Sequence, residues 1–266
     1  MNNIYICFPG GKHKVLTMSY DDGRREDYRL VELFNRSGIR GTFNLNSGME
    51  SDTRRIPMSE WKELYQGHEI ACHTFSHPTL ARCPIEQTAR QILEDRERLE
   101  ALTGAPVRGL AYPNGSYNGR IRELLPMLGI RYARVVQTTG QFTMPEDLYA
   151  WSGTCHHNQK LLERAGEFLA LCKTQYLYLF YVWGHSYEFT DHDNWSVMER
   201  FCEMMGGQEN IWYATNIEIA DYMDAAGRLQ FTAAGDRVCN PSAQSVWIEV
   251  NRDAHIEIPG GALVSL

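Results

Sequence analysis

The chain has 266 residues, 43% of them hydrophobic and 22% charged, which is typical of a globular protein large enough to bury a sizeable core. Its formal net charge is -7 and it contains no basic run, which argues against nucleic acid as a partner. No apolar stretch approaches the length of a membrane span, and the first residues lack a signal-peptide pattern. The 7 cysteines are irregularly spaced without a CxxC pair, as expected of reduced thiols, so we expect a cytoplasmic protein with no membrane partner.

Strands and helices alternate along most of the chain. Apolar or β-branched runs predict strands that begin at Val15 and cover residues 39–45, 69–72, 107–112, 130–136, 148–151, 176–183 and 211–214. Helical periodicity and terminal glycines predict helices over residues 26–37, 59–66 (with Ser59 as N-cap), 85–103, 118–128, 161–172, 195–205 and 216–226. Seven or eight such alternations indicate an α/β protein with parallel strands, and we expect a distorted (β/α)7-8 barrel. No glycine-rich phosphate fingerprint follows a strand, which disfavours a dinucleotide-binding fold.

After Gly227 the pattern changes to short alternating segments. Strands are predicted over residues 229–231, 246–250, 255–258 and 263–265, separated by Gly, Pro and Asn turns. No linker separates them from the rest of the chain. We therefore expect residues 1–227 to form the barrel and residues 228–266 to form a small C-terminal antiparallel β appendage that packs on it.

Asp21 and Asp22 end the first barrel strand, just before Gly23. Neighbouring side chains of a strand point to opposite faces, but a chain that turns at Gly23 can bring both carboxylates into one pocket. Two adjacent anions are costly unless a cation or a shared proton relieves them. The pair therefore suggests a site of chemistry, with an ordinary strand and Asp-Gly turn as the alternative.

His73 and His77 stand four residues apart, directly after strand 69–72. If one helical turn forms there, both imidazoles fall on one face and can hold a single ion, although many such pairs are incidental. In β/α barrels the active site lies at the C-terminal ends of the strands, where the two aspartates also lie. Two histidines and one aspartate leave a coordination position open for water, as in catalytic zinc sites.

Two further strands end in polar residues. Strand 107–112 leads into the turn Pro113-Asn114-Gly115, and strand 176–183 runs through Gly184 into His185. A histidine after a strand is usually a surface or capping residue. On the same face of the barrel as the other polar groups, His185 becomes a candidate functional residue.

These four segments resemble the motifs of the polysaccharide deacetylase family, the chitooligosaccharide deacetylase-like carbohydrate esterase family 4, and the resemblance spans residues 14–223. The family's Thr-Phe-Asp-Asp-Gly motif corresponds to residues 19–23 (Ser-Tyr-Asp-Asp-Gly), and its His-Ser/Thr-x-x-His motif is matched in full by residues 73–77. Its late strand ending in histidine corresponds to residues 182–185. The third motif differs, because the family has Arg-x-Pro-aromatic where this chain has Ala111-Tyr112-Pro113-Asn114. The usual Asp-Trp motif is also not evident, and Trp151, His156 and His157 occupy that part of the chain.

The resemblance implies a metal-dependent hydrolase that removes an N-acetyl or similar amide-linked acyl group from an amino sugar or oligosaccharide. The implied roles are metal ligation by Asp22, His73 and His77, general base catalysis by Asp21, general acid catalysis by His185, and oxyanion stabilisation by the backbone N–H of Asn114. The metal would be one divalent ion, with zinc the expected choice. A small carbohydrate would bind near Pro113 and Asn114 and stack on Tyr112, Trp151 and Trp183.

Ala111 stands where the family has the arginine that holds the catalytic aspartate. Arg134 is the best substitute, because it lies in the strand next to the one that ends at Tyr112, and adjacent parallel strands are about 5 Å apart. We predict that its guanidinium reaches Asp21; the alternative is that it points outward to a surface carboxylate. Two other functions stay open, namely hydrolysis of another C–N bond, as in a cyclic ureide or imide, and catalytically silent sugar binding.

Overall fold

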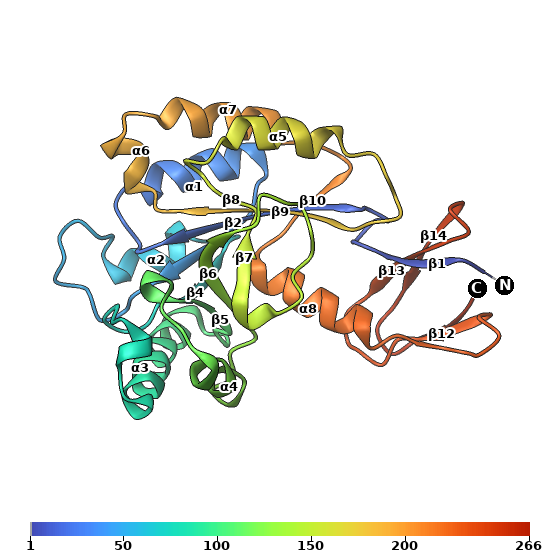
Figure 1. Cartoon of the computed structure of the whole chain (residues 1–266), viewed down its shortest axis with the longest axis horizontal. Helices are drawn as coiled ribbons and strands as arrows, with labels where there is room; N and C mark the ends of the chain where they lie inside the picture. The colour runs from blue at the N-terminus through green and yellow to red at the C-terminus, as the bar shows by residue number, and fades with distance from the viewer. Residues whose placement is uncertain (1) are drawn as a thin grey trace.

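The computed structural model describes residues 2–266, so Met1, the first residue of the predicted barrel segment, lies outside it. The chain forms an α/β barrel with small antiparallel sheets at one end (Figure 1). The barrel strands are β2 (Lys14–Asp21), β3 (Gly41–Leu45), β4 (Glu69–Cys72), β5 (Gly109–Ala111), β6 (Tyr132–Thr138), β7 (Trp151–Gly153), β8 (Cys155–His156), β9 (Tyr178–Gly184) and β10 (Ile211–Tyr213). The α-helices are α1 (Asp27–Ser37), α2 (Met58–Leu64), α3 (Ile85–Thr103), α4 (Gly119–Met127), α5 (Leu161–Ala170), α6 (Tyr187–Asp191), α7 (Trp195–Met205) and α8 (Asn216–Gly227). Short 3₁₀ turns cover Leu80–Arg82, Pro113–Gly115 and Leu148–Ala150.

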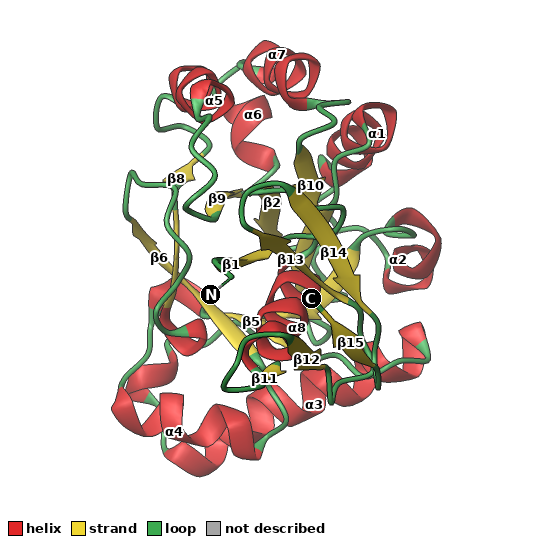
Figure 2. Ribbon diagram, turned by 90° about the vertical axis from the view of Figure 1, so that its right-hand side faces the viewer, coloured by secondary structure: helices red, strands yellow, loops and turns green. Residues whose placement is uncertain are grey.

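The barrel strands are parallel, and β2 is their centre. It pairs with β9 along one edge and with β3 and β10 along the other, and β4, β5 and β6 follow β3 in order. β7 pairs with β6, whereas β8, which is separated from β7 by Thr154 alone, pairs with β9. Residues 151–156 therefore close the ring, and the predicted distorted barrel is confirmed. Figure 2 shows the helices arranged around these strands.

Alternation along β2 separates the core from the site. Leu16, Met18 and Tyr20 lie in the hydrophobic core that includes residues of α1 and α7, and all three are buried. The intervening residues carry polar side chains, and Thr17 donates a hydrogen bond to Asn216 Oδ1 at 2.8 Å. Asp21 is the last residue in this polar series. The same pleat that packs the helices on the barrel thus aims Asp21 away from them.

Most predicted elements are present, with shifted ends. Helices 85–103 and 195–205 and strand 69–72 are found with the predicted bounds. Ser59 is not the N-cap of α2; the helix begins at Met58 after Pro57, and no side chain caps it. The short segments β8 and α6 were not predicted, since a two-residue strand and a five-residue helix are too short to show a period.

The C-terminal extension consists of two small antiparallel sheets. One contains β11 (Gln230–Phe231), β12 (Arg237–Cys239) and β15 (Leu263–Ser265), and the other contains β13 (Val246–Val250) and β14 (Ala254–Ile258). The N-terminal strand β1 (Ile4–Cys7) pairs with β13, which places it in the extension although the sequence predicts residues 1–227 as barrel. Within residues 2–266, no helix is long and apolar enough to cross a membrane.

Candidate active site

Asp21 and Asp22 lie at the C-terminal end of β2, where the chain leaves the barrel. Asp21 is the last residue of the strand and is 3% exposed. Asp22 adopts φ 81° and Gly23 follows with φ 61°, so the turn begins at Asp22 itself and not only at the glycine. A left-handed conformation is costly for a residue with a Cβ atom, and it redirects the Asp22 carboxylate towards the site.

The histidine pair is brought together by a turn that differs from the predicted one. Residues 73–79 contain no helical turn; Thr74 has φ 66° and His77 has φ 58°. The ring centroids of His73 and His77 are nevertheless 4.8 Å apart. The buried Asp95 of α3 fixes the start of this turn, because its carboxylate accepts the backbone N–H groups of His73 (3.1 Å) and Ser47 (2.8 Å).

Asp22, His73 and His77 fit a divalent metal ion. One ligand atom from each lies within 4.8 Å of the others. His73 Nδ1 is 2.8 Å from the carbonyl oxygen of Ala111, to which it donates, so Nε2 carries the lone pair and is free to coordinate. Burial lowers the pKa of His73 to about 4, against the opposing charges of Asp21 and Asp22. The imidazole is therefore neutral at pH 7, which is the form that binds metals.

Arg55 was not predicted and pairs with Asp22. Its guanidinium lies 3.2 Å from Asp22 Oδ1 and also donates to the backbone oxygen of Asp22 and to Asn46 Oδ1. Burial would raise the pKa of Asp22, but His73 and Arg55 lower it below its ordinary value. Arg55 comes from an irregular loop that carries no periodic signal, so sequence reasoning could not place it.

Asp21 is held by two donors inside the barrel. Its Oδ1 accepts from Asn44 Nδ2 at 2.9 Å, and its Oδ2 accepts from Arg134. Burial alone would raise the pKa of Asp21, but the charge of Arg134, followed by those of His73 and His185, lowers it to about 2. Asp21 is consequently ionised at neutral pH.

The predicted contact of Arg134 is present in the structure. Arg134 pairs in register with Ala111 across β5 and β6, so it occupies the place beside the residue that replaces the motif arginine. It is fully buried and lies 4.5 Å above the Trp183 ring, a cation–π contact that orients the guanidinium towards Asp21. The alternative of an outward-facing Arg134 is therefore wrong.

His185 stands across the site from the histidine pair. Its Nε2 is 3.9 Å from Asp21 Oδ2, and its Nδ1 is 3.0 Å from Glu188 Oε1. Glu188 Oε2 also lies 2.9 Å from His157 Nε2 and 3.2 Å from His156 Nε2. Three imidazoles therefore surround one carboxylate. Burial would lower the pKa of His185, but the hydrogen bond to Glu188 and then the charge of Asp21 raise it.

Two of the predicted sugar-stacking residues are not available for stacking. Tyr112 is 1% exposed, its ring stacks on Tyr117, and its hydroxyl donates to the Tyr149 carbonyl. Trp151 is fully buried and packs edge-on against Tyr132 and Tyr181. Both side chains are packed in the hydrophobic core, so the expectation of a stacking role for them was wrong.

The other three predicted substrate-binding residues lie nearer the chemistry. Pro113 and Asn114 form the turn after β5, and Asn114 has φ 56°, a left-handed residue like Asp22, Thr74 and His77. Trp183 is 8% exposed and contacts His156 edge-on at 4.6 Å. Left-handed residues that gather at one place commonly mark a preorganised functional site.

Two supporting residues left a signal in the sequence. Asp95 falls on the apolar face of its helix, between Ile92 and Leu99, where a charged residue needs a partner. Glu188 stands three residues after His185, the spacing of one helical turn. Asn44, the second donor to Asp21, lies in a strand and looks unexceptional in sequence.

Comparison with known proteins supports the resemblance to a known family. The polysaccharide deacetylase family model matches residues 9–133, which include the first three motif segments. A peptidoglycan-N-acetylglucosamine deacetylase of Bacillus cereus is 25% identical over 112 residues. This stretch covers 41% of this chain and 40% of that protein, so the chain matches less than half of the relative's length.

Solved structures share the fold over most of the chain. A Mycobacterium smegmatis protein assigned to the polysaccharide deacetylases aligns with TM-score 0.61 and 17% identity, covering 84% of this chain and 94% of its own. A pseudoenzyme of carbohydrate esterase family 4 from Bacillus anthracis aligns with TM-score 0.52 and 13% identity, covering 82% and 68%. The chain thus resembles the polysaccharide deacetylase family in sequence over residues 9–133 and shares the fold of solved structures over most of its length.

Proposed function

We propose that this protein is a metal-dependent deacetylase that hydrolyses an N-acetyl or similar amide-linked acyl group on an amino sugar or oligosaccharide. One observation carries the proposal: an ionised aspartate held by Arg134 lies beside a three-residue metal-ligand set and within 3.9 Å of His185. A base, a metal site and an acid within reach of one another are what amide hydrolysis requires.

The residues divide the work as follows. Asp22, His73 and His77 hold the ion, which we propose to be zinc; when bound it supplies Lewis acidity and lowers the pKa of a coordinated water towards 7. Asp21, kept ionised by Arg134, accepts the proton of the attacking water. The Asn114 N–H donates to the developing oxyanion, and His185 donates its proton to the leaving amine.

Glu188 positions His185 and favours its charged form. The 3.0 Å contact to Nδ1 fixes the ring, so that Nε2 faces Asp21 and the reacting atoms. Burial would raise the pKa of Glu188, but hydrogen bonds from His157 and His185 lower it well below its ordinary value. The carboxylate therefore stays ionised and supports an imidazolium that can act as the acid.

The proposed substrate class is taken by analogy from the names of the relatives. The Bacillus cereus relative is named for peptidoglycan N-acetylglucosamine, and a Bacillus subtilis relative for peptidoglycan N-acetylmuramic acid. An N-acetylated saccharide is accordingly our first choice of substrate. A cyclic ureide or imide would use the same centre with a different pocket.

Catalytically silent sugar binding is a second candidate, favoured by Ala111 at the arginine position of the third motif. A fold relative from Bacillus anthracis is described as a pseudoenzyme, and a mutant of it as having restored activity. The pairing of Arg134 with Asp21 favours the active enzyme, since a charge-equivalent group occupies the vacated space.

Acetate release separates the three candidates. The metal-free protein, reloaded with zinc, is incubated with N-acetylglucosamine oligomers and with cyclic ureides, with Asp21→Asn as the matched control. Acetate release that depends on metal and on Asp21 supports the deacetylase. Ureide hydrolysis supports the second chemistry, and saccharide binding without turnover supports the silent protein.

A further inference from the structure

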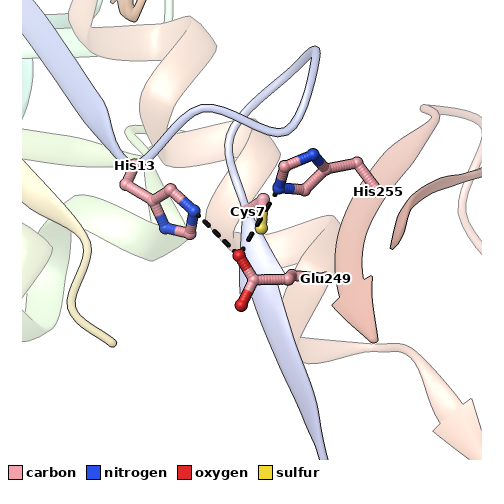
Figure 3. A group of neighbouring side chains, drawn as sticks. All are labelled: Cys7, His13, Glu249 and His255. Atoms are coloured by element: carbon pink, nitrogen blue, oxygen red, sulfur yellow. Dashed lines mark ion pairs between the residues drawn. The ribbon is translucent and has the colours of Figure 1, made fainter. Parts of the chain in front are cut away.

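A second group of metal-ligating side chains lies at the other end of β2, between the barrel and the extension (Figure 3). We call Cys7, His13, Glu249 and His255 the seam cluster. Ligand atoms of all four lie within 4.8 Å of one another. His13 precedes β2 and Asp22 follows it, so the seam cluster is roughly 30 Å from the candidate active site at about 3.3 Å per strand residue.

The register of the three-stranded sheet puts three of these residues on one face. Glu249 of β13 pairs directly with His255 of β14 and with Tyr5 of β1, and Cys7 lies two residues beyond Tyr5 on the same face. The opposite face carries the apolar side chains of the extension's own core, including Ile248 and Ile258. The ligating side chains therefore lie on the face that the core does not use.

A tight turn adds the fourth residue. The chain reverses after β1, where Phe8 bridges to Lys12 and where Gly10 and Gly11 have φ 76° and 75°. A Cβ atom at Gly11 would come within 2.5 Å of the His255 ring, so only glycine allows this approach. The turn brings His13 back over the sheet, where its Nε2 is 3.2 Å from Glu249 Oε2.

The polar groups of the seam cluster are poorly satisfied by one another. His13 Nδ1 has no hydrogen-bond partner in the described part of the chain, and Nε2 meets only the Glu249 carboxylate, although both nitrogens are shielded from solvent. Glu249 is 4% exposed, and its only ion-pair partners among residues 2–266 are His13 and His255, with no lysine or arginine. A buried carboxylate of this kind lacks a cation.

We propose that the seam cluster binds one divalent ion of the zinc class through a thiolate, two imidazoles and a carboxylate. In tetrahedral zinc sites, bonds of 2.0–2.3 Å place the ligand atoms about 3.3–3.8 Å apart. The contacts of Glu249 Oε2 with His13 Nε2 (3.2 Å) and with His255 Nε2 (3.4 Å) are close to this spacing. The proposal does not depend on the proposed function.

The donor set indicates a structural ion. Four protein ligands close a tetrahedral site, whereas a catalytic site keeps a position open for water. A thiolate among the ligands favours zinc over magnesium or calcium, which prefer oxygen. Bound there, the ion ties the turn before β2 to the β13–β14 hairpin and so fastens the extension to the barrel.

Cobalt substitution tests the proposal without measuring activity. A cobalt ion bound by a thiolate gives a near-ultraviolet charge-transfer band, and the Asp22-His73-His77 site contains no cysteine. We expect the band in the reduced, cobalt-loaded wild type and in the Asp22→Ala variant, and its loss in Cys7→Ser. Cys202→Ser, which removes another buried thiol elsewhere, is the matched control and should keep the band.

A second variant covers the case in which Cys7→Ser does not fold. The His255 side chain is 45% exposed, so His255→Ala should fold, and removing one ligand should weaken cobalt binding about 10-fold or more. The site would be overturned if the wild type lacked the band or if the band survived in Cys7→Ser. It would also be overturned if His255→Ala bound cobalt as tightly as the wild type. The seam cluster would then be a set of histidine–carboxylate pairs without a metal.

Discussion

The two ends of β2 carry ligating residues that are assembled in different ways. At the C-terminal end, Asp21 and Asp22 are neighbours in sequence, and His73 and His77 are four residues apart. At the N-terminal end, the seam cluster joins the first strand to a hairpin near the end of the chain. A motif can reveal the first kind of site, whereas only strand pairing reveals the second.

Backbone geometry also separates the two ends. Asp22, Thr74, His77 and Asn114 hold left-handed conformations around the candidate active site. Near the seam cluster, the left-handed residues are Gly10 and Gly11 in the turn before β2 and Asn251 and Arg252 in the turn between β13 and β14. The left-handed residues near the seam cluster are thus confined to turns, whereas at the candidate active site two of them, Asp22 and His77, are proposed ligands themselves.

The largest expected effect comes from replacing each of the two adjacent aspartates separately. Asp22→Ala should lose the metal, because only two imidazoles remain as ligands. Asp21→Asn should keep the metal and lose turnover by about 10²–10⁴-fold, since the base is removed while the ligands stay. Metal analysis and rate measurements on the two purified variants check this, and equal metal loss in both would contradict the division of roles.

Removing His185 should discriminate between substrates. If His185 protonates the leaving amine, His185→Ala should lower the maximal rate on amide substrates by about 10²–10³-fold. Aryl acetate esters should be affected much less, because their leaving group needs no proton. Rates on both substrates with the same enzyme preparation are the measurement; equal losses would indicate a structural role.

Replacing Arg134 should shift the pH dependence as well as the rate. Burial raises the pKa of Asp21 and Arg134 holds it down to about 2, so Arg134→Ala should raise this pKa. Asp21 acts as an anion, and the acid limb of kcat/KM should therefore move to higher pH. Turnover at pH 7 should fall about 10-fold or more with the metal retained. Arg134→Lys, which keeps the charge, should restore part of the low-pH activity; an unmoved acid limb would reject the role.

How far the sequence predicts this molecule depends on how local each feature is. The barrel, the motif residues and the Arg134 contact follow from strand order and from neighbours across adjacent strands. The spacing of His73 and His77 would suit a helical turn as well as the left-handed turn that is present, because the spacing alone cannot distinguish the two. Arg55 and the seam cluster depend on an irregular loop and on pairing between the chain's two ends, which periodicity does not encode.

The smallest expected effect concerns Glu188, which touches no reacting atom in the proposed mechanism. Its hydrogen bond raises the pKa of His185, so Glu188→Gln should lower that pKa towards the value that burial favours. The acid form of His185 is then lost at lower pH, and the alkaline limb of kcat should move to lower pH. At pH 7 the rate should fall by a few fold, up to about 10-fold, which is roughly one pKa unit.

The control for Glu188 addresses stability, since His156 and His157 also pair with this carboxylate. Glu188→Gln keeps a hydrogen-bond acceptor for the buried His157 ring, and its thermal midpoint should stay within a few degrees of the wild type. A lower midpoint with an unmoved alkaline limb would make Glu188 a structural residue of the histidine cluster. A moved limb with the fold intact would extend the proposed site to α6, a helix too short to be predicted from sequence periodicity.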